Sequence, residues 1–390
     1  MILSFFSTFK IVRAEWLSGW GKRVKLVIDQ NDIDSDLSGF PVLIYLSASS
    51  GRGPDDVSFV FDEIQSDSNR KKIAVTTSDG TTQCYVEIER WDQASEKAWL
   101  WAKVPTVSGT VDTVLYLYYN RTHSDNTAYV GDTDSTPAQN VWDTNHKGVW
   151  HLDEETNGTA VMKDSTSNDN DGTPRYGAVL GATGRAGKAV DIDGSNDYVY
   201  CPDSSSLDIS GTGLTMSAWI CPDFDATRNP NAITVDKRGG ANAAAYRLFW
   251  KGSTDSEFDW GLRITAGGTD TNLFTTSVTW TVDTWHYLVG TYDGSNMRIY
   301  WDGAQENSLA KTGSISTSDY ELGIAGYYEA NPFDGTVDEV RISDYPRSAA
   351  WIKASYESER DHLIDYWSEE GSSSFSAFID EASIAIGTSE

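Results

Sequence analysis

The sequence predicts an all-β protein made of two antiparallel β-sandwiches in tandem. Short runs rich in β-branched and aromatic residues recur along most of its 390 residues, and clusters of Gly, Asp, Asn and Ser separate them. No long stretch repeats its apolar residues at helical spacing. A chain of this length is long enough for two or three domains, each with a core of its own.

The strands expected in the first half lie at residues 24–29, 40–46, 57–61, 72–75, 84–89, 98–104 and 113–119. In these runs, apolar residues alternate with polar ones or form short blocks between turn residues. A stretch rich in Thr, Asp and Ser follows at 120–140. We expect it to connect the two halves, with Tyr129 and Val130 packing it against a surface.

The second half begins near Gly148. Its expected strands lie at 189–192, 198–200, 214–220, 232–235, 246–250, 260–264, 286–292, 297–301, 320–325 and 337–342. A helix is expected at 348–359, because Ser348 can cap it and apolar residues follow at helical spacing. After Trp367 the composition turns to Ser, Gly and Ala, which indicates a linker or the start of another module.

The composition excludes several classes of function. Lys and Arg number 30 against 58 Asp and Glu, which gives a formal charge of −28 and argues against nucleic-acid or anionic-lipid binding. No stretch is long and apolar enough to insert into a membrane. Residues 1–10 resemble a signal peptide only weakly, because they lack a basic start and their apolar run is short.

One late strand carries a charge where a core residue is expected. Residues 334–335 predict a turn, and residues 337–342 then alternate, which places Asp338 on the same face as Val340 and Ile342, toward the core. A carboxylate on a core face is unfavourable unless it is paired or holds a cation. Two interpretations stay open: an Asp satisfied by backbone N–H groups, or a calcium ligand near the end of a sandwich.

The cysteines form no complete disulfide framework. There are three, Cys84, Cys201 and Cys221, and their spacing fits no metal motif. Cys201 and Cys221 both precede Pro-Asp at the end of an apolar run. We expect two buried thiols there, with a disulfide between them as the alternative.

A set of motifs in the second half has a specific order and spacing: 150–154, 164–172, 190–194 with 198–199, 215–220, 285–287, 292–294 and 333–342. With these motifs, the segment from Gly148 to about Tyr356 resembles a laminin-G-like jelly roll of the concanavalin A-like lectin and glucanase superfamily. The resemblance implies that the second sandwich, at 146–368, is a concanavalin A-like jelly roll. Residues 369–390 would then be a linker or the start of a further module.

The first half has marks of its own: Trp20 with Arg23, 40–44, 61–62, 86–92, 113–119 and 141–143. They resemble a domain of unknown function that often precedes such jelly rolls in prokaryotic and phage surface proteins. The resemblance implies a sandwich at 14–145 after a leader or N-terminal arm at 1–13. It implies a location at a surface and brings no known chemistry.

The loop at 164–171 is rich in Asp and Asn, whose oxygens calcium prefers as ligands, and it lacks the spacing of an EF-hand. Concanavalin A-like sandwiches often hold a structural calcium between an early loop and a late strand. The resemblance therefore implies a site formed by Asp164, Asn168, Asp171 and Asp338. The alternative is a turn stabilised by Asx hydrogen bonds.

The middle strands and late loops of the second half carry candidate sugar-binding side chains. Aromatic rings can stack on sugars, and arginines can bind hydroxyls or acidic groups. The candidates are Tyr246, Trp250, Trp260, Arg263, Tyr327 and Tyr328, with Arg247 beside them. Tyr246 and Trp250 share a strand face with Leu248, so the alternative places both rings in the core.

Catalysis is the weaker hypothesis. Glucanases of this superfamily use two carboxylates on one strand face, and the candidates here are Glu257 with Asp259 and Glu87 with Glu89. No further acid follows the first pair at alternate positions, and the second pair lies outside the jelly roll. We expect both pairs on solvated strand faces, and no nucleophile motif is present.

These observations favour a non-catalytic carbohydrate-binding or adhesion module of an extracellular, cell-surface or virion protein, such as a tail fibre or receptor-binding protein. The weak leader favours the virion. The expected partner is a glycan or a host cell-surface polysaccharide, with homo-oligomers or other surface proteins as further partners. A glycoside hydrolase and a purely structural surface protein are the alternatives.

Overall fold

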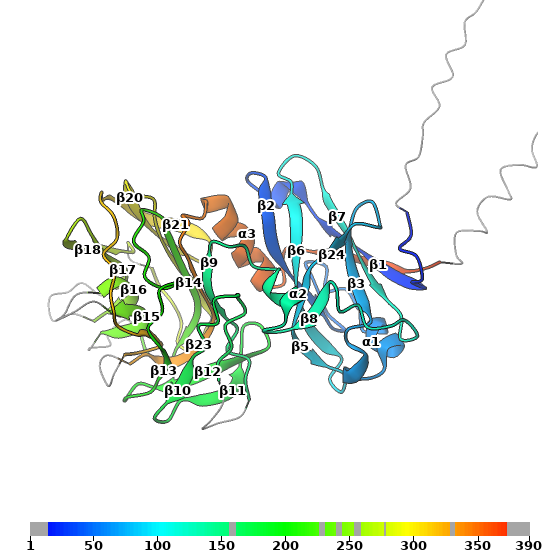
Figure 1. The fold of residues 1–390 in the computed structure, drawn as a ribbon, viewed down its shortest axis with the longest axis horizontal. Coiled ribbons are helices and arrows are strands. Elements are labelled where there is room, and N and C mark those ends of the chain that lie inside the picture. Colours follow the sequence, from blue (N-terminus) through cyan, green and yellow to red (C-terminus); the bar gives the residue numbers. More distant parts are fainter. Residues whose placement is uncertain are drawn as a thin grey trace, which may run out of the picture.

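The computed structural model describes residues 15–155, 161–225, 231–238, 244–252, 259–276, 278–327 and 332–372. Strands account for 48% of the structure and helices for 8%. The strands form two lobes, each built from a pair of sheets (Figure 1). The predicted all-β architecture is therefore confirmed. Within the described residues, no helix is long and apolar enough to cross a membrane.

The first lobe pairs a five-stranded sheet, in the order β24-β1-β7-β3-β4, with a four-stranded sheet, in the order β2-β6-β5-β8. Its strands are β1 (Lys22–Ile28), β2 (Leu37–Leu46), β3 (Ile73–Thr77), β4 (Gln83–Cys84), β5 (Val86–Asp92), β6 (Lys97–Val107), β7 (Thr113–Tyr119), β8 (Val130–Asp132) and β24 (Asp365–Gly371). Short helices are η1 (Gln30–Asp32), α1 (Phe59–Ile64), η2 (Asp67–Asn69) and α2 (Thr136–Gln139). Because β8 pairs in parallel with β5, the connector at 120–140 packs on this lobe.

The strand predicted at 57–61 is wrong, because α1 occupies this part of the chain. Val57, Val60, Phe61 and Ile64 are all fully buried. Their spacing is i, i+3, i+4 and i+7, which is the apolar face of a helix. The helical period therefore prevails over the β propensity of single residues in this segment.

The second lobe is a sandwich of two larger antiparallel sheets. The seven-stranded sheet has the order β10-β13-β22-β15-β16-β17-β18, and the other has the order β11-β12-β23-β14-β19-β20-β21, with β9 also paired to β23. The strands are β9 (His146–Trp150), β10 (Thr173–Arg175), β11 (Val179–Thr183), β12 (Lys188–Asp193), β13 (Tyr198–Cys201), β14 (Leu214–Pro222), β15 (Ala232–Arg238), β16 (Ala244–Lys251), β17 (Asp259–Ala266), β18 (Thr269–Phe274), β19 (His286–Tyr292), β20 (Asn296–Trp301), β21 (Ala304–Ala310), β22 (Leu322–Ile324) and β23 (Asp334–Ser343). A large apolar core lies between these sheets. All three cysteines are free thiols, so Cys201 and Cys221 are not bridged.

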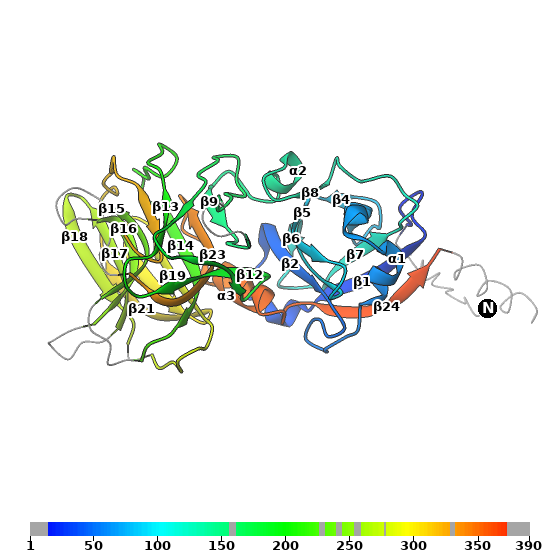
Figure 2. The same ribbon diagram turned by 90° about the horizontal axis from the view of Figure 1, so that it is seen from below.

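The chain returns to the first lobe at its end. The helix α3 (Ala349–Glu359) lies between the lobes, and Ser348 caps it as predicted by accepting a hydrogen bond from Trp351 N. Beyond α3, strand β24 pairs with β1 of the first lobe (Figure 2), and Tyr366 enters that lobe's core. The boundary predicted at residue 368 is therefore wrong, since residues 365–371 complete the first sandwich.

Candidate functional site

The central strand β23 changes face at a bulge. Trp219 of β14 lies opposite Asp338, whereas Ser217 lies opposite Arg341, so β23 carries one extra residue between these pairs. Glu339, within the bulge, has a φ of 49°, which is in the left-handed region. Residues directly opposite each other in an antiparallel pair share a face. Asp338 therefore shares the face of Trp219, which packs against Ile352 of α3 and not in the core between the sheets.

The prediction that Asp338 shares a face with Val340 and Ile342 is consequently wrong. Both apolar side chains lie in the core, but the extra residue reverses the alternation before them. The Asp338 carboxylate accepts backbone hydrogen bonds from Arg185 N at 2.7 Å and Ala186 N at 3.0 Å through Oδ2, and from Glu339 N at 2.8 Å through Oδ1. It anchors the turn before β12.

The proposed calcium ligands do not converge. Asp164 Oδ1 accepts from Val149 N at 3.0 Å and Thr166 N at 2.9 Å, while its Oδ2 accepts from Asn170 N at 2.9 Å. The Asn168 side-chain amide donates to His146 O at 3.1 Å, and Asp171 pairs with Lys163 at 2.8 Å. Across the described residues, Asp164, Asp171 and Asp338 form no common ligand group. The Asx-turn alternative describes this loop, and calcium binding by the chain stays a prediction.

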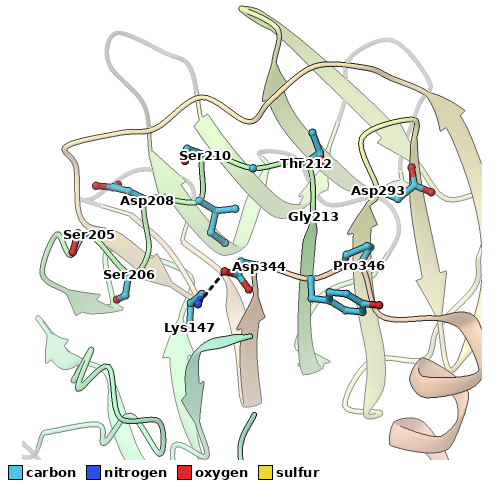
Figure 3. A pocket seen from close by; sticks show the side chains of 13 residues that line it. Lys147, Ser205, Ser206, Asp208, Ser210, Thr212, Gly213, Asp293, Asp344 and Pro346 are labelled. Atoms are coloured by element: carbon cyan, nitrogen blue, oxygen red, sulfur yellow. Dashed lines mark ion pairs between the residues drawn. The ribbon is translucent and has the colours of Figure 1, made fainter. Parts of the chain in front are cut away.

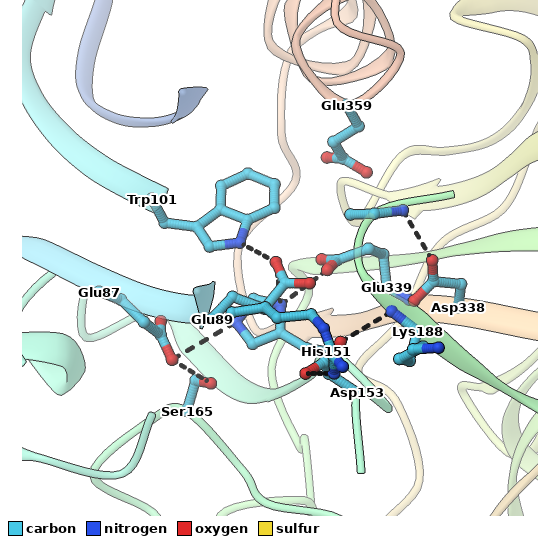
Figure 4. A network of polar contacts seen from close by, with 12 residues as sticks. Glu87, Glu89, Trp101, His151, Asp153, Ser165, Lys188, Asp338, Glu339 and Glu359 are labelled. Atoms are coloured by element: carbon cyan, nitrogen blue, oxygen red, sulfur yellow. Dashed lines mark hydrogen bonds and ion pairs between the residues drawn. The ribbon is translucent and has the colours of Figure 1, made fainter. Parts of the chain in front are cut away.

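A network of buried charges lies where the two lobes meet (Figure 4). The Nδ1 atom of His151 is 2.7 Å from Glu339 Oε1, and its Nε2 atom is 3.4 Å from Glu87 Oε1 in β5. Glu89, also in β5, lies 3.6 Å from Nδ1. Burial alone would lower the pKa of His151, but the carboxylates of Glu339, Glu87 and Glu89 outweigh it and raise the pKa well above its usual value.

Arg341 of β23 is the second cation of this network. It donates to Glu339 Oε2 and to Glu359 Oε1, each at 2.5 Å. Its guanidinium carbon lies 4.5 Å from the ring centre of Trp101 and 5.1 Å from that of Trp142, both in the first lobe. The lobes are therefore joined by ion pairs set among aromatic rings.

The network contains the group of residues best placed to hold a metal. One ligand atom each from Glu89, His151 and Glu339 lies within 4.8 Å of the others, and the described residues contain no other such group. However, His151 Nδ1 is hydrogen-bonded to Glu339, and Glu339 also pairs with Arg341. These bonds join His151, Glu339 and Arg341, so we interpret the group as an ion-pair network, in which Glu89 Oε1 and His151 Nε2 make no hydrogen bond within the described residues.

The acids considered for catalysis do not form an accessible pair. Glu87 is fully buried and accepts from Trp142 Nε1 at 2.7 Å and Ser165 Oγ at 2.8 Å. Glu89 accepts from Trp101 Nε1 at 2.7 Å. The prediction of a solvated strand face for Glu87 and Glu89 is wrong, because the second lobe covers them. Glu257 lies outside the described residues.

The structure disperses the predicted sugar-binding residues. Tyr246, Trp250 and Trp260 are fully buried in the core between the sheets, where no sugar reaches them. This outcome follows from strand alternation, the alternative stated for Tyr246 and Trp250. Tyr327 is buried and donates from its hydroxyl to Glu321 at 2.8 Å, and Arg263 Nε donates to Asn272 Oδ1 at 2.8 Å. Tyr328 lies outside the described residues.

A polar cavity of about 530 Å³ opens at one end of the second lobe (Figure 3). We call it the loop cavity. It is lined by Lys147, Ser205, Ser206, Asp208, Ile209, Ser210, Gly211, Thr212, Gly213, Asp293, Asp344, Tyr345 and Pro346. The Tyr345 side chain is 52% exposed, and Lys147 Nζ pairs with Asp344 at 2.9 Å.

Hydrogen bonds and close packing fix the walls of the loop cavity. A Cβ atom on Gly213 would lie 2.6 Å from Asp344 O, so only glycine lets these segments meet. Thr215 Oγ1 donates to Tyr345 O at 2.8 Å, and Asp293 accepts from two backbone N–H groups of its own turn. Sequence reasoning missed this site. Two features of the sequence could have indicated the cavity: the run rich in Ser, Asp and Gly at 203–213, and the Asp-Tyr-Pro sequence that follows the last jelly-roll strand.

Residues 193–353 match the family model described as the Concanavalin A-like lectin/glucanases superfamily. These residues form a concanavalin A-like domain. The loop cavity lies almost wholly within that domain, since Lys147 is its only lining residue before the matched segment. The β-sheet region that precedes the domain has no assigned family.

Several solved structures are similar to part of this chain. Domain 4 of AbnA, an extracellular GH43 arabinanase from Geobacillus stearothermophilus in complex with arabinotriose, has 17% identity and a TM-score of 0.42, covering 53% of this chain and 96% of that one. The binding domain of Paraclostridial Mosquitocidal Protein 1 has 15% identity and a TM-score of 0.44, covering 55% and 52%. The binding domain of botulinum neurotoxin serotype G has 11% identity and a TM-score of 0.41, covering 54% and 50%. The chain thus spans about half the length of these toxin binding domains. No curated protein sequence matches the chain.

Proposed function

We propose that the chain is a non-catalytic glycan-binding module whose binding site is the loop cavity. The observation that carries the proposal is the exposed Tyr345 ring beside hydroxyl and carboxylate groups and the Lys147 ammonium group. A sugar presents an apolar ring face and a rim of hydroxyls. Tyr345 offers the stacking surface, while Asp208 and Asp293 offer acceptors for hydroxyl groups.

The dimensions and stiffness of the loop cavity support the same function. A volume of about 530 Å³ falls within the range of roughly 300–1,000 Å³ that is typical of small-molecule sites. Asp293 is already held by two backbone N–H groups, and Asp208 by Lys237 at 3.2 Å. Groups fixed before binding lose little conformational entropy when a ligand arrives.

We further propose that the module works in adhesion outside a cell or on a virion, with a surface polysaccharide as its partner. The formal charge of −28 suits a solvated surface that avoids nucleic acid. The Glu87 and Glu89 side chains, 0% and 1% exposed, favour binding over hydrolysis at this pair, because a polymer cannot reach buried carboxylates.

A glycan array probed with the full chain, followed by titration of the best ligand, tests the loop cavity. Tyr345→Ala should weaken binding by about tenfold or more, because it removes the stacking surface. The matched control is Tyr176→Ala, which removes a tyrosine of similar exposure, 57%, that does not line the cavity. Equal affinity of Tyr345→Ala and the wild-type chain would reject the loop cavity as the site.

The hydrolase and structural alternatives make different claims. Reducing ends released from β-glucans or other polysaccharides by the full chain would overturn the non-catalytic assignment. Absence of binding across a broad array would leave the structural surface protein as the better hypothesis.

A further inference from the structure

A second cavity, of about 270 Å³, lies where α3 covers the concanavalin A-like domain. We call it the arginine cavity. It is lined by Arg185, Trp219, Trp285, Tyr356, Arg360 and His362. None of these residues lines the loop cavity, so the two sites are separate.

Aromatic rings and guanidinium groups are layered in the arginine cavity. Trp219 and Tyr356 stack with ring centres 5.6 Å apart and planes inclined by 19°. The guanidinium carbon of Arg185 lies 5.2 Å from the Trp219 ring centre, and that of Arg360 lies 5.2 Å from the Tyr356 ring centre. Two cations thus flank one aromatic stack.

Arg185 differs from the other buried arginines in having no anionic partner. Arg341 pairs with Glu339 and Glu359, and Arg347 pairs with Asp143 at 2.7 Å. The guanidinium of Arg185 makes no hydrogen bond or ion pair with any residue in the described ranges, and its Nε atom is buried without an acceptor. A cation without an ion pair in a half-buried place is costly, which points to a partner outside the described part of the chain.

The nearby acidic groups do not supply that partner. Asp361 accepts from Gly51 N at 2.9 Å, and Glu359 is bound by Arg341 and by Trp219 Nε1 at 2.6 Å. Glu357 pairs with Arg360 at 3.0 Å and His362 at 3.2 Å. Burial lowers the pKa of Arg185 and the like charge of Arg360 adds to this effect, while the carboxylates of Asp361 and Glu359 oppose it only in part and form no ion pair with the guanidinium.

The fold holds Arg185 in place. Its backbone N–H donates to Asp338 Oδ2, so the bulge in β23 fixes the turn that carries it. The anchored backbone, together with the Trp219 ring 5.2 Å from the guanidinium carbon, restricts where the side chain can lie and so lowers the entropy lost on binding.

We propose that the arginine cavity binds the carboxylate of an acidic sugar residue. Arg185 offers a planar fork that matches a carboxylate in a bidentate manner, and Trp285, at the cavity wall, offers an apolar face for the sugar ring. The volume lies below the usual range of roughly 300–1,000 Å³, so the cavity accommodates one sugar residue and not a long segment. This site goes beyond the loop cavity and adds a charge requirement to glycan recognition.

Titration of the full chain with glucuronic acid, followed by NMR, tests the ligand class. The acid should bind, and its methyl ester, which keeps the shape but loses the charge, should bind about tenfold more weakly or worse. Glucose should resemble the ester. Equal binding of acid and ester would overturn the proposal, and inorganic sulfate binding as tightly as the acid would overturn the sugar part of it.

Two variants test the residue. Arg185→Gln should lose glucuronic acid binding by about tenfold or more. It should melt at the same or a higher temperature without ligand, because the uncompensated charge is gone. Arg175→Gln is the matched control, since Arg175 lies exposed over Tyr200 at 4.8 Å and lines neither cavity. If Arg185→Gln melts lower and binds the acid normally, Arg185 is structural and the proposal is wrong.

The outcomes separate this site from the loop cavity. Tyr345→Ala should leave glucuronic acid binding unchanged, and Arg185→Gln should leave binding of a neutral array ligand unchanged. Should Arg185→Gln fail to fold, Trp285→Ala takes its place, with the same expected loss of acid binding, because Trp285 is half-buried at the cavity wall. Normal acid binding by that variant would contradict the stacking role.

Discussion

The core of the concanavalin A-like domain and the contact between the lobes are packed with different kinds of side chain. Between the two sheets a large cluster of apolar side chains is buried, and aromatic rings such as Trp250 and Trp260 pack 5.5 Å apart. Between the lobes, by contrast, Glu89, His151 and Arg341 are buried together.

The difference determines what each region contributes. Apolar burial is non-directional and does not depend on protonation, so it stabilises the sandwich over a wide range of pH and salt. A buried ion pair gives little net stability, but removal of one partner is costly because the other is left charged. The lobe contact therefore fixes one relative arrangement of the lobes and is the region that responds to charge changes.

The substitution with the largest expected effect is Arg341→Met, in the contact between the lobes. Methionine keeps an apolar side chain against Trp101 and Trp142 but carries no charge. The change leaves Glu359 without its cation and removes one of the two cations beside Glu339, which keeps His151. We expect a loss of about 3–5 kcal/mol in the free energy of unfolding, measured by urea denaturation. The double variant with Glu359→Gln should recover part of that loss, because one of the uncompensated charges is removed.

Trp260→Ala is the control, because it removes a side chain from the apolar core and not from the contact between the lobes. It should also lose about 3–5 kcal/mol, since it leaves a cavity in the core. Glu359→Gln should not repair it, because Trp260 and Glu359 belong to different regions. Equal recovery in both backgrounds, or a negligible loss for Arg341→Met, would contradict the proposed difference between the regions.

The next effect concerns pH and His151. A histidine whose pKa is raised on folding adds stability that is fully present below its ordinary pKa of about 6.5 and is lost as the pH rises through the folded value. The free energy of unfolding should therefore be higher for the wild-type chain than for His151→Gln, and this difference should be largest below pH ~6.5. The difference should become smaller as the pH rises above that value.

The control is His362→Gln, at a side chain that is 50% exposed, whose difference from the wild type should stay small across the same range. The measurement is urea denaturation of all three proteins at several pH values. A gap for His151→Gln that widens with rising pH would mean that His151 is neutral in the folded protein.

Much of the fold followed from period-two patterns, but one inserted residue reversed the most important inference. Alternation placed Asp338 beside Val340 and Ile342, and no local signal in the sequence marks the bulge at Glu339. Strand β24 was missed for a related reason. Tyr366 gains its burial from the distant first lobe, a long-range contact that local composition does not encode.

The candidate sites were harder to predict than the fold. Aromatic residues such as Trp250 and Trp260 attract attention as sugar platforms, yet strand alternation sends them into the core. The loop cavity depends instead on Tyr345, which follows the last jelly-roll strand, and on segments that only the fold brings together. The unpaired state of Arg185 is likewise a property of its surroundings in space.

The smallest expected effect concerns α3, which contributes Glu359 to the lobe contact. Ser348 accepts a hydrogen bond from Trp351 N at the start of this helix, and its replacement by alanine should cost about 0.5–2 kcal/mol of unfolding free energy. Ser348→Asp keeps an acceptor at the cap and adds a favourable charge at the helix N-terminus, so it should retain wild-type stability. Because the hydrogen bonds of Ser348 go to Trp351 N and Ile352 N and not to the charge network, the loss in Ser348→Ala should be the same at every pH at which the difference between the wild type and His151→Gln changes. A loss that followed the His151 titration would mean that the helix and the charge network are a single cooperative element, and that α3 orders only when the lobes are in contact.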